Sequence, residues 1–273
     1  MRKPPRESQP SGESPWARAR EARPGDETPA REVRLYGLNA CLAAFAKRPD
    51  ALRKVYLTET RMQALKHVLA WCVQHRLGYR LVEDADLDKL TGSRHHEGVC
   101  FEMLRAPPLT LPKLLAAQPP SAPSLLLWLD GVGNPHNVGA LLRTAAHFGV
   151  DGVISPAGFD VSGAAARVAE GAAEVVPFVQ ARSASDALVA LRAHGYSLAA
   201  TVPHDATALY STTLPERLVL VFGAEGEGMS EAMIAAADLR LTIPGSGEIE
   251  SLNVAASVAV VLGEYWRQHA RGP

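Results

Sequence analysis

Short apolar segments of two kinds alternate along residues 32–104. One kind repeats apolar side chains at helical spacing, as Leu65, Val68 and Cys72 do, and the other is short and β-branched or aromatic. Order is expected to begin near Val33, and the alternation predicts a small α/β domain. The expected helices are residues 38–46, 61–75 and 84–90, and the expected strands are residues 54–58, 79–82 and 99–103.

The pattern changes in residues 124–273, where strands become fully apolar. Leu125–Leu129 is an unbroken apolar run, which is typical of a strand buried on both faces. Regular alternation of strand and helix predicts a parallel sheet covered on both sides, with ligand sites in the loops that follow the strands. The expected strands are residues 125–129, 152–155, 175–179, 197–202, 218–222 and 239–243, and the expected helices are residues 140–148, 164–173, 184–194, 231–237 and 253–269.

Two further segments have the composition of connecting or solvated chain. Residues 1–31 contain almost no aliphatic side chains and are predicted to be a disordered tail, because they cannot bury enough apolar area to order themselves. Residues 105–123 are rich in proline, which opposes a continuous helix or a central strand. We expect a semi-rigid linker there that holds one short helix.

Composition indicates an ordinary globular protein and narrows the choice of partners. Hydrophobic residues make up 47% and charged residues 21% of the chain, and the formal net charge is −1, so any RNA contact must come from local basic patches. No run of about 18 apolar residues and no signal-peptide core occur, so a cytoplasmic protein without a membrane span is expected. The three cysteines, Cys41, Cys72 and Cys100, form no zinc-like cluster and are expected to be small buried side chains in a reducing compartment.

The first of three unusual loops follows Leu125–Leu129 and contains Asn134, Asn137 and Gly139. Both asparagines fit Asx-turns or a helix cap. Arg143 does not fit that explanation, because it lies in the apolar helix that follows, where an unpaired charge is costly. We expect Arg143 to be paired or to face a site, and its planar guanidinium suits a phosphate or a ribose edge.

The second loop, residues 222–230, holds Gly223, Gly226 and Gly228. Glycines let the backbone approach a ligand closely and adopt a positive φ. Their spacing, G-x-x-G-x-G after a late strand, differs from the dinucleotide fingerprint and from the common Rossmann-type methyltransferase loop, and no P-loop motif occurs in the chain. A tight turn capped by Ser230 is the structural alternative.

The third loop, residues 243–253, ends a strand and opens the final helix. The free N–H groups at a helix start bind polar ligand groups. Ser251 and Asn253 also fit the simpler role of helix caps. Because the carboxyl ends of parallel strands meet at one edge of a sheet, the three loops are expected to lie together.

In order and spacing the three loops resemble the TrmH (SpoU) family of SPOUT methyltransferases. The matching segments are N-x-x-N-x-G-A-x-x-R-T-A at 134–145, V-F-G-A-E-G-x-G at 221–228, and I-P followed by E-S-L-N-V at 243–254. Residues 32–104 resemble the L30e-like RNA-binding domain that many members carry. The segment Ser14–Pro29 is similar to the YfiF-type branch.

The resemblance implies a fold, a cofactor and a partner. The implied fold is an α/β methyltransferase domain whose C-terminal part is threaded into a trefoil knot, an exception to the usual rule for connections. S-adenosylmethionine would lie bent in the knot, and the implied protein is a homodimer with the final helix in its interface. The implied reaction methylates a ribose 2′-hydroxyl in ribosomal or transfer RNA. The implied cofactor contacts are Thr201, Gly223, Ala224, Gly226, Ile243 and Leu252.

The resemblance also assigns catalytic roles. Arginine at the position of Arg143 acts as the base in that family, but a guanidinium stays protonated, so we expect Arg143 to hold phosphate and stabilise alkoxide charge. Glu225 is expected to orient Asn137 or Arg143, and Ser251 with Asn253 to position the ribose. Alignment of the reacting atoms alone can supply several kcal/mol.

One departure from the family pattern supports an alternative. The methionine that usually follows Ile-Pro is Gly245 here. This glycine is expected to make the loop more flexible and to weaken cofactor binding. The alternative is a methyltransferase-like RNA-binding protein with little activity that acts in ribosome assembly, although every polar motif position is present. A nicotinamide-dependent reductase fails for lack of the glycine fingerprint and its acidic partner.

Overall fold

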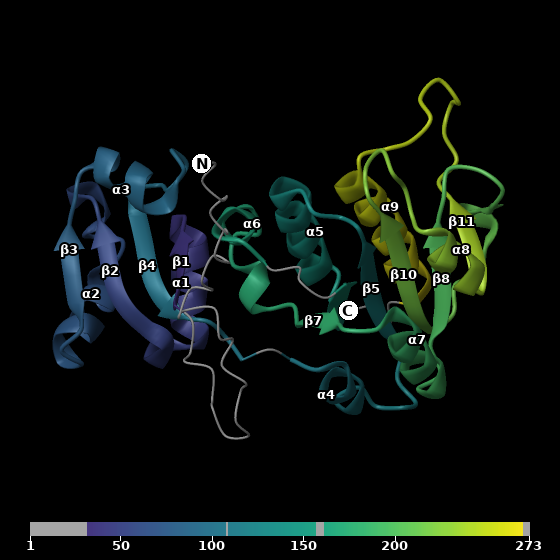
Figure 1. Ribbon diagram of the computed structural model, residues 1–273, viewed down its shortest axis with the longest axis horizontal. Coiled ribbons are helices and arrows are strands. Elements are labelled where there is room, and N and C mark those ends of the chain that lie inside the picture. The colour runs from purple at the N-terminus through teal and green to yellow at the C-terminus, as the bar shows by residue number, and fades with distance from the viewer. Residues whose placement is uncertain (1–31, 108, 157–160, 270–273) are drawn as a thin grey trace, which may run out of the picture. The chain divides into compact units, whose positions relative to one another are not determined.

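The computed structural model describes residues 32–107, 109–156 and 161–269 (Figure 1). The predicted disordered tail, residues 1–31, and the segment Ser14–Pro29 lie outside the described residues. Within the described ranges, no helix has the length and apolar character needed to cross a membrane.

A four-stranded sheet with the order β1-β4-β2-β3 organises the N-terminal part. β2 and β3 are parallel, and β4 is antiparallel to both β1 and β2. Helices and strands alternate as predicted, but β1 was not predicted because its sequence, Glu-Val-Arg-Leu-Tyr, is short and half charged. The strands are β1 (Glu32–Tyr36), β2 (Leu52–Leu57), β3 (Gly78–Leu81) and β4 (Val99–Leu104), the helices are α1 (Leu38–Lys47), α2 (Lys66–Gln74) and α3 (Asp84–Thr91), and the 3-10 turns are η1 (Pro49–Ala51) and η2 (Glu59–Arg61).

A seven-stranded sheet with the order β7-β6-β5-β10-β8-β11-β9 organises the C-terminal part. Every neighbouring pair in it is parallel, as the sequence predicted. The strands are β5 (Ser124–Asp130), β6 (Gly152–Pro156), β7 (Phe178–Ala181), β8 (Ser197–Thr201), β9 (Thr207–Ala208), β10 (Arg217–Gly223) and β11 (Leu239–Thr242).

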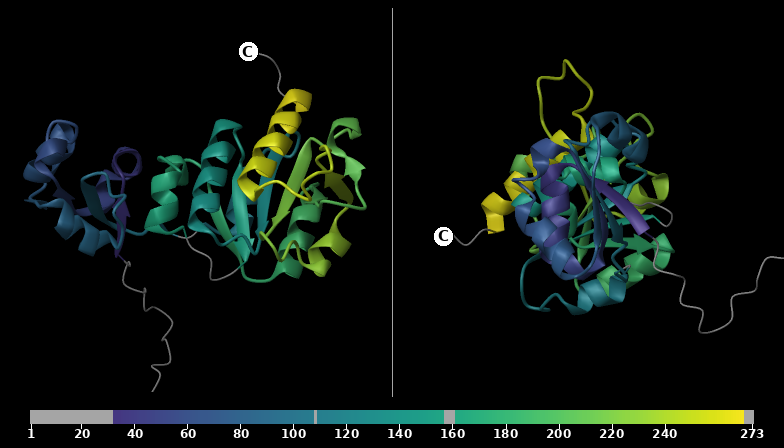
Figure 2. Two further views of the ribbon diagram at one scale, coloured as in Figure 1. Left: turned by 90° about the horizontal axis from the view of Figure 1, so that it is seen from above. Right: turned by 90° about the vertical axis from the view of Figure 1, so that its left-hand side faces the viewer.

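Helices cover both faces of the larger sheet. Side chains of β5 alternate between two cores, with Leu127 in the core that includes helices α5 and α9 and Trp128 in the core that includes α4, α7 and α8. Figure 2 shows α5 and α9 side by side on one face. The helices are α4 (Leu111–Ala116), α5 (Pro135–His147), α6 (Gly163–Val168), α7 (Ala184–Ala193), α8 (Glu231–Ala236) and α9 (Val254–His269), with 3-10 turns η3 (Ala172–Glu174) and η4 (Leu209–Ser211).

Several predicted elements have wrong boundaries. The predicted helix 164–173 ends at Val168, because Glu170 and Gly171 adopt positive φ values of 49° and 94°. The predicted strand 175–179 is wrong in its first half, and β7 begins only at Phe178 after Pro177. The predicted helix 61–75 starts only at Lys66, after a 3-10 turn.

The three cysteines are free and buried, as predicted for small core side chains. Burial raises the pKa of each thiol above its usual range, and it raises the pKa of Cys100 to about 12. The thiols are therefore protonated and unreactive at neutral pH.

Candidate functional site

The carboxyl ends of four neighbouring strands, β5, β10, β8 and β11, meet at one edge of the larger sheet. The three unusual loops leave from β5, β10 and β11, and Thr201 is the last residue of β8. The sequence-based expectation that the loops lie together is therefore confirmed by strand order. In Figure 1 the yellow segment between β11 and α9 extends beyond the sheet.

The first two loops are tied to each other by the Asp130 carboxylate. Asp130 Oδ2 at the end of β5 accepts a hydrogen bond of 2.7 Å from the backbone N–H of Ser230. The second loop closes on itself through two backbone bonds of 2.9 Å between Ala224 and Gly228. A β-carbon on Gly223 would lie 2.4 Å from the backbone of Gly228, so only glycine fits there. Ser230 occupies the N-cap position of α8, but its side chain makes no capping hydrogen bond, so the structural alternative of a turn capped by the Ser230 side chain is wrong in that respect.

The helix that follows the first loop begins earlier than predicted. Asn134 is its N-cap, and its Oδ1 accepts a hydrogen bond of 2.9 Å from the N–H of His136. Pro135 occupies the first helical position, where its missing N–H carries no cost. Because Asn134 serves as the cap, the side chain of Asn137 in the first turn is left for other contacts.

Asn253 joins all three loops. Its Nδ2 donates to Asn137 Oδ1 at 3.1 Å and to Glu225 Oε1 at 2.5 Å. Its Oδ1 accepts from the N–H groups of Ala255 and Ala256 at the start of α9. Asn253 is therefore both a helix cap and the centre of a polar cluster, which we call the Asn253 cluster (Asn137, Glu225 and Asn253).

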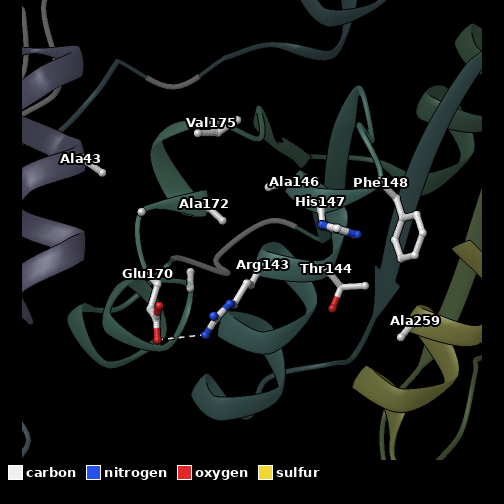
Figure 3. Close-up of a pocket in the computed structure, with 12 residues that line it drawn as sticks. Ala43, Arg143, Thr144, Ala146, His147, Phe148, Glu170, Ala172, Val175 and Ala259 are labelled. Carbon is white, nitrogen blue, oxygen red and sulfur yellow. Dashed lines mark ion pairs between the residues drawn. The ribbon is translucent and has the colours of Figure 1, made fainter. Parts of the chain in front are cut away.

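Within the described residues, no hydrogen bond or ion pair joins Arg143 to the Asn253 cluster. Its Nη1 is 2.9 Å from Glu170 Oε1, and both side chains are substantially exposed. Figure 3 shows the two side chains pointing toward each other at the rim of a surface pocket of about 700 Å³. The expectation that Arg143 is paired is confirmed, whereas Glu225 contacts Asn253 and not Arg143. The remaining pocket residues come from α1, α5, the turn between α6 and β7, and α9.

The remaining predicted residues surround the same sheet edge. Ser251 and Leu252 are exposed in the third loop, Ile243 is half-buried at its start, and Ala224 and Gly226 belong to the second loop. The hydroxyl of Thr201 donates to the carbonyl of Val221 at 2.7 Å, which joins β8 to β10.

The loops have the properties that an adenosine cofactor needs. β-Carbons added at Gly226 or Gly245 would meet nothing within 4 Å, so the backbone of both loops is open to a ligand. The third loop, which carries Ser251 and Asn253, also has two exposed apolar side chains, Leu252 and Ile249. Apolar surface with a few convergent backbone donors and acceptors suits a nucleoside.

Two residues of this region were not singled out from the sequence. Asp130 was visible as a carboxylate directly after a buried strand, which is a usual position for a ligand or loop anchor. Glu170 had no such signal, because its role depends on a helix end that the sequence placed elsewhere. In the described part of the chain, no cluster of three or more His, Cys, Asp or Glu side chains is arranged to hold a metal ion.

Comparison with known proteins identifies the family of both parts. Residues 124–263 match the SpoU rRNA Methylase family, and residues 34–108 match the family described as RNA 2'-O ribose methyltransferase substrate binding. The uncharacterized tRNA/rRNA methyltransferase YfiF of Escherichia coli O157:H7 is 36% identical over 281 residues, which cover 94% of this chain and 81% of that protein. The 23S rRNA (guanosine-2'-O-)-methyltransferase RlmB of Nitrosomonas europaea is 35% identical over 241 residues, which cover 87% of this chain and 92% of that protein.

A solved structure agrees with the fold. The SpoU methyltransferase AviRb from Streptomyces viridochromogenes, in complex with the cofactor AdoMet, has a TM-score of 0.70 at 22% identity and covers 88% of this chain and 92% of its own. The family matches, not this structure, confirm the resemblance drawn from the three loops. Because the family match spans residues 124–263 and the relatives align over most of their own length, this chain belongs to the SpoU rRNA methylase family.

Proposed function

We propose that this protein transfers a methyl group from S-adenosylmethionine to a ribose 2′-hydroxyl of ribosomal RNA. As a member of the SpoU family it is an S-adenosylmethionine-dependent RNA methyltransferase. The finer assignment to ribosomal RNA is supported by the 23S rRNA activity in the name of its Nitrosomonas relative. The observation that carries the proposal is the Asn253 cluster, which holds polar groups of three loops together at the carboxyl edge of the sheet.

The hydrogen bonds of the Asn253 cluster leave specific atoms for the substrate. Both polar atoms of Asn253 are already engaged. Asn137 Nδ2 and Glu225 Oε2 bond to no residue that the structure describes. One is a donor and the other an acceptor, so together they can bind the hydroxyl and a neighbouring oxygen of a ribose.

The reaction needs alignment and charge stabilisation from the protein. When bound, S-adenosylmethionine would supply an electrophilic methyl group whose bond to sulfur breaks as the ribose oxygen bonds to the methyl carbon, and the proton of the hydroxyl would pass through its hydrogen-bond acceptor to solvent. In this proposal Glu225 accepts the hydrogen bond of that hydroxyl. Ser251, two residues before Asn253 in the third loop, contacts the ribose. Arg143 binds phosphate and stabilises negative charge through its protonated guanidinium.

The two sheets divide the work in this proposal. Residues 32–104 hold the RNA, residues 105–123 link the parts, and residues 124–273 carry out the transfer. The substrate-binding family match over residues 34–108 supports the first assignment. The substrate is a cytoplasmic RNA, so we expect the protein in the cytoplasm.

We also propose a homodimer formed through residues 124–273, with α9 in the interface. Large apolar side chains remain exposed on and beside α9, since Trp266 and Tyr210 are more than half exposed. The pocket beside Arg143 is lined by apolar side chains of α5 and α9, including Ala146 and Ala259. Exposed apolar surface of this kind is a usual feature of subunit interfaces.

Binding of the cofactor tests the proposal first. Titration calorimetry of the full chain with S-adenosylmethionine is expected to give one site per chain at micromolar to low millimolar concentration. No binding at millimolar cofactor would contradict the enzyme assignment and favour an RNA-binding protein without activity.

A further inference from the structure

We propose that Glu170 is a positioning residue that sets the orientation of the Arg143 guanidinium during methyl transfer. The proposal rests on the proposed function and adds a residue to it. Its starting observation is the 2.9 Å contact between Arg143 Nη1 and Glu170 Oε1, which Figure 3 shows at the rim of the pocket.

A close helix contact brings the two residues together. Gly139 lies in the same helix as Arg143, one turn earlier, and faces α6. A β-carbon on Gly139 would lie 2.5 Å from Val168 Cβ and 2.6 Å from the carbonyl oxygen of Ala165, so only glycine permits this distance between α5 and α6. Because α6 ends beside α5, the residue that follows its last turn can reach Arg143.

The turn that carries Glu170 is fixed by its own backbone bonds. The N–H of Glu170 donates to Arg167 O at 3.0 Å, and the N–H of Ala172 donates to Ala169 O at 3.0 Å. The next residue, Gly171, has a φ of 94° and would place a β-carbon 2.6 Å from Ala43 Cβ of α1. The backbone at Glu170, and with it the origin of the side chain, is therefore fixed by the fold.

Glu170 itself has an unfavourable backbone conformation. Its φ of 49° lies in the left-handed region, which costs free energy for a residue other than glycine. The ion pair with Arg143 does not offset this cost, because a pair whose side chains are 59% and 44% exposed contributes almost nothing to folding stability. Stability alone does not explain a glutamate at this position, where glycine would relax the backbone.

The contact leaves Arg143 free to act. It uses only Nη1, and the other guanidinium N–H groups bond to nothing within the residues that the structure describes. A guanidinium held on one side by a carboxylate presents a fixed fork to a phosphate or to a developing alkoxide. Without Glu170, Arg143 would sample several rotamers and spend less time in the productive one.

Two variants separate positioning from folding. Glu170→Gly removes the carboxylate and relaxes the backbone, so we expect kcat to fall about tenfold or more while Tm stays equal or rises. Glu170→Gln keeps the shape and removes the charge, and a similar fall in kcat is expected. Affinity for S-adenosylmethionine, measured by calorimetry, is expected to stay within about threefold, because the Glu170 carboxylate pairs with Arg143 and, within the described residues, with no residue of the second or third loop.

A second exposed ion pair, Arg192–Asp238, provides the matched control. Arg192 and Asp238 form an ion pair of nearly the same exposure on the other face of the sheet, and Arg192→Ala is expected to leave kcat unchanged. Wild-type kcat in both Glu170 variants, with Arg143→Ala inactive, would overturn the positioning role alone. A parallel loss of kcat and Tm in Glu170→Gly would also overturn it, whereas an inactive wild-type protein would contradict the proposed function instead.

Discussion

At position 253 one side chain performs two tasks, and the two tasks use different atoms. The carbonyl oxygen of Asn253 caps α9 by accepting from Ala255 and Ala256, and its amide nitrogen holds Glu225 and Asn137. The sequence left open whether Asn253 is a cap or a site residue. The structure shows that the two interpretations are compatible, because an asparagine has both a donor and an acceptor end.

Substitution at Asn253 separates the cap from the site. Serine is as good an N-cap as asparagine but has no amide to donate across the loops, so Asn253→Ser is expected to keep stability and lower kcat about tenfold or more. Asn253→Ala is expected to lose the cap as well and about 1 kcal/mol of stability. Chemical denaturation and single-turnover methylation check both effects. Full activity of Asn253→Ser would show that the Asn253 cluster is not used in catalysis.

Arg143 is expected to contribute to the rate of methyl transfer and not to the affinity for the cofactor. Arg143→Ala is expected to abolish methylation and to leave the affinity for S-adenosylmethionine within a few-fold, because the guanidinium pairs with Glu170 and, within the described residues, with no residue of the second or third loop. Methylation assays and calorimetry on the same preparation check this. Loss of cofactor binding in the variant would mean that Arg143 has a structural role.

The residues of the site were predictable where a local pattern determines them. Glu225, Ser251 and Asn253 follow strands in a parallel sheet, and that position alone marks them as candidates. The Arg143–Glu170 pair was not predictable, because it depends on where α6 ends and on the close packing at Gly139. Contacts that depend on the approach of two helices have no signature in one stretch of sequence.

At the level of elements, the end of β10 and the second loop form one rigid unit. A β-carbon at Gly223 would lie 2.4 Å from Gly228 C and Met229 N, and backbone atoms cannot turn aside as a side chain can. Gly223→Ala is therefore expected to displace residues 224–228 and to cost about 1 to 3 kcal/mol.

The expected consequence for Gly223→Ala is weaker cofactor binding together with a lower Tm, measured by calorimetry. Gly78→Ala is the matched control, since its β-carbon would meet nothing within 4 Å and Gly78 lies in the other sheet. Unchanged affinity and stability in Gly223→Ala would show that this loop rearranges freely.

The last helix, α9, contains a charge cluster that makes its stability depend on pH. Hydrogen bonds from Arg267 and Gln268 lower the pKa of Glu264 from its ordinary value of 4.5 to about 2. A lowered pKa in the folded state contributes stability above pH 4.5, and that contribution is lost as the pH falls toward 2.

Glu264→Gln is expected to be less stable than wild type at neutral pH. The difference is expected to shrink as the pH falls through 4.5 toward 2, where the wild-type carboxylate also becomes protonated. Urea denaturation at a series of pH values measures it. A difference that does not depend on pH would mean that the carboxylate charge plays no part.

Helices and strands with a clear apolar periodicity were predicted well. Helices and strands whose ends depend on backbone conformation or on distant pairing were not. The apolar strand β5 and the helices α7 and α9 lie within one residue of their predicted bounds. The helix after β6 was predicted too long, because alanine-rich sequence favours helix and the positive φ of Glu170 is not visible in composition. The strand β1 depends on pairing with β4, which is distant in sequence.

At the scale of the molecule, the proposed homodimer is open to direct measurement. Light scattering is expected to give twice the chain mass of 29.1 kDa. Ala259→Arg places a charge in the apolar pocket between α5 and α9 and is expected to shift the mass to that of one chain, with unchanged circular dichroism. Val189→Arg, at an exposed position of α7, is the control. A wild-type mass of one chain would contradict the dimer.

The family relationship extends over both sheets. Cofactor class and reaction class follow from membership of the SpoU family. The trefoil knot stays a prediction, and so does the choice of ribosomal over transfer RNA. A net charge of −1 gives no global attraction to RNA, so the RNA must be recognised by local surfaces.

The most direct measurement is methyl transfer itself. Ribosomal RNA from a strain that lacks this protein is incubated with the purified full chain and S-adenosylmethionine labelled in the methyl group, and the RNA is then digested to nucleosides. Label is expected in one 2′-O-methylated nucleoside, at a site that is unmethylated in the deletion strain, and little label is expected with Arg143→Ala. Label on a base, or no label in the ribosomal RNA despite cofactor binding, would contradict the assignment as a ribose 2′-O-methyltransferase of ribosomal RNA.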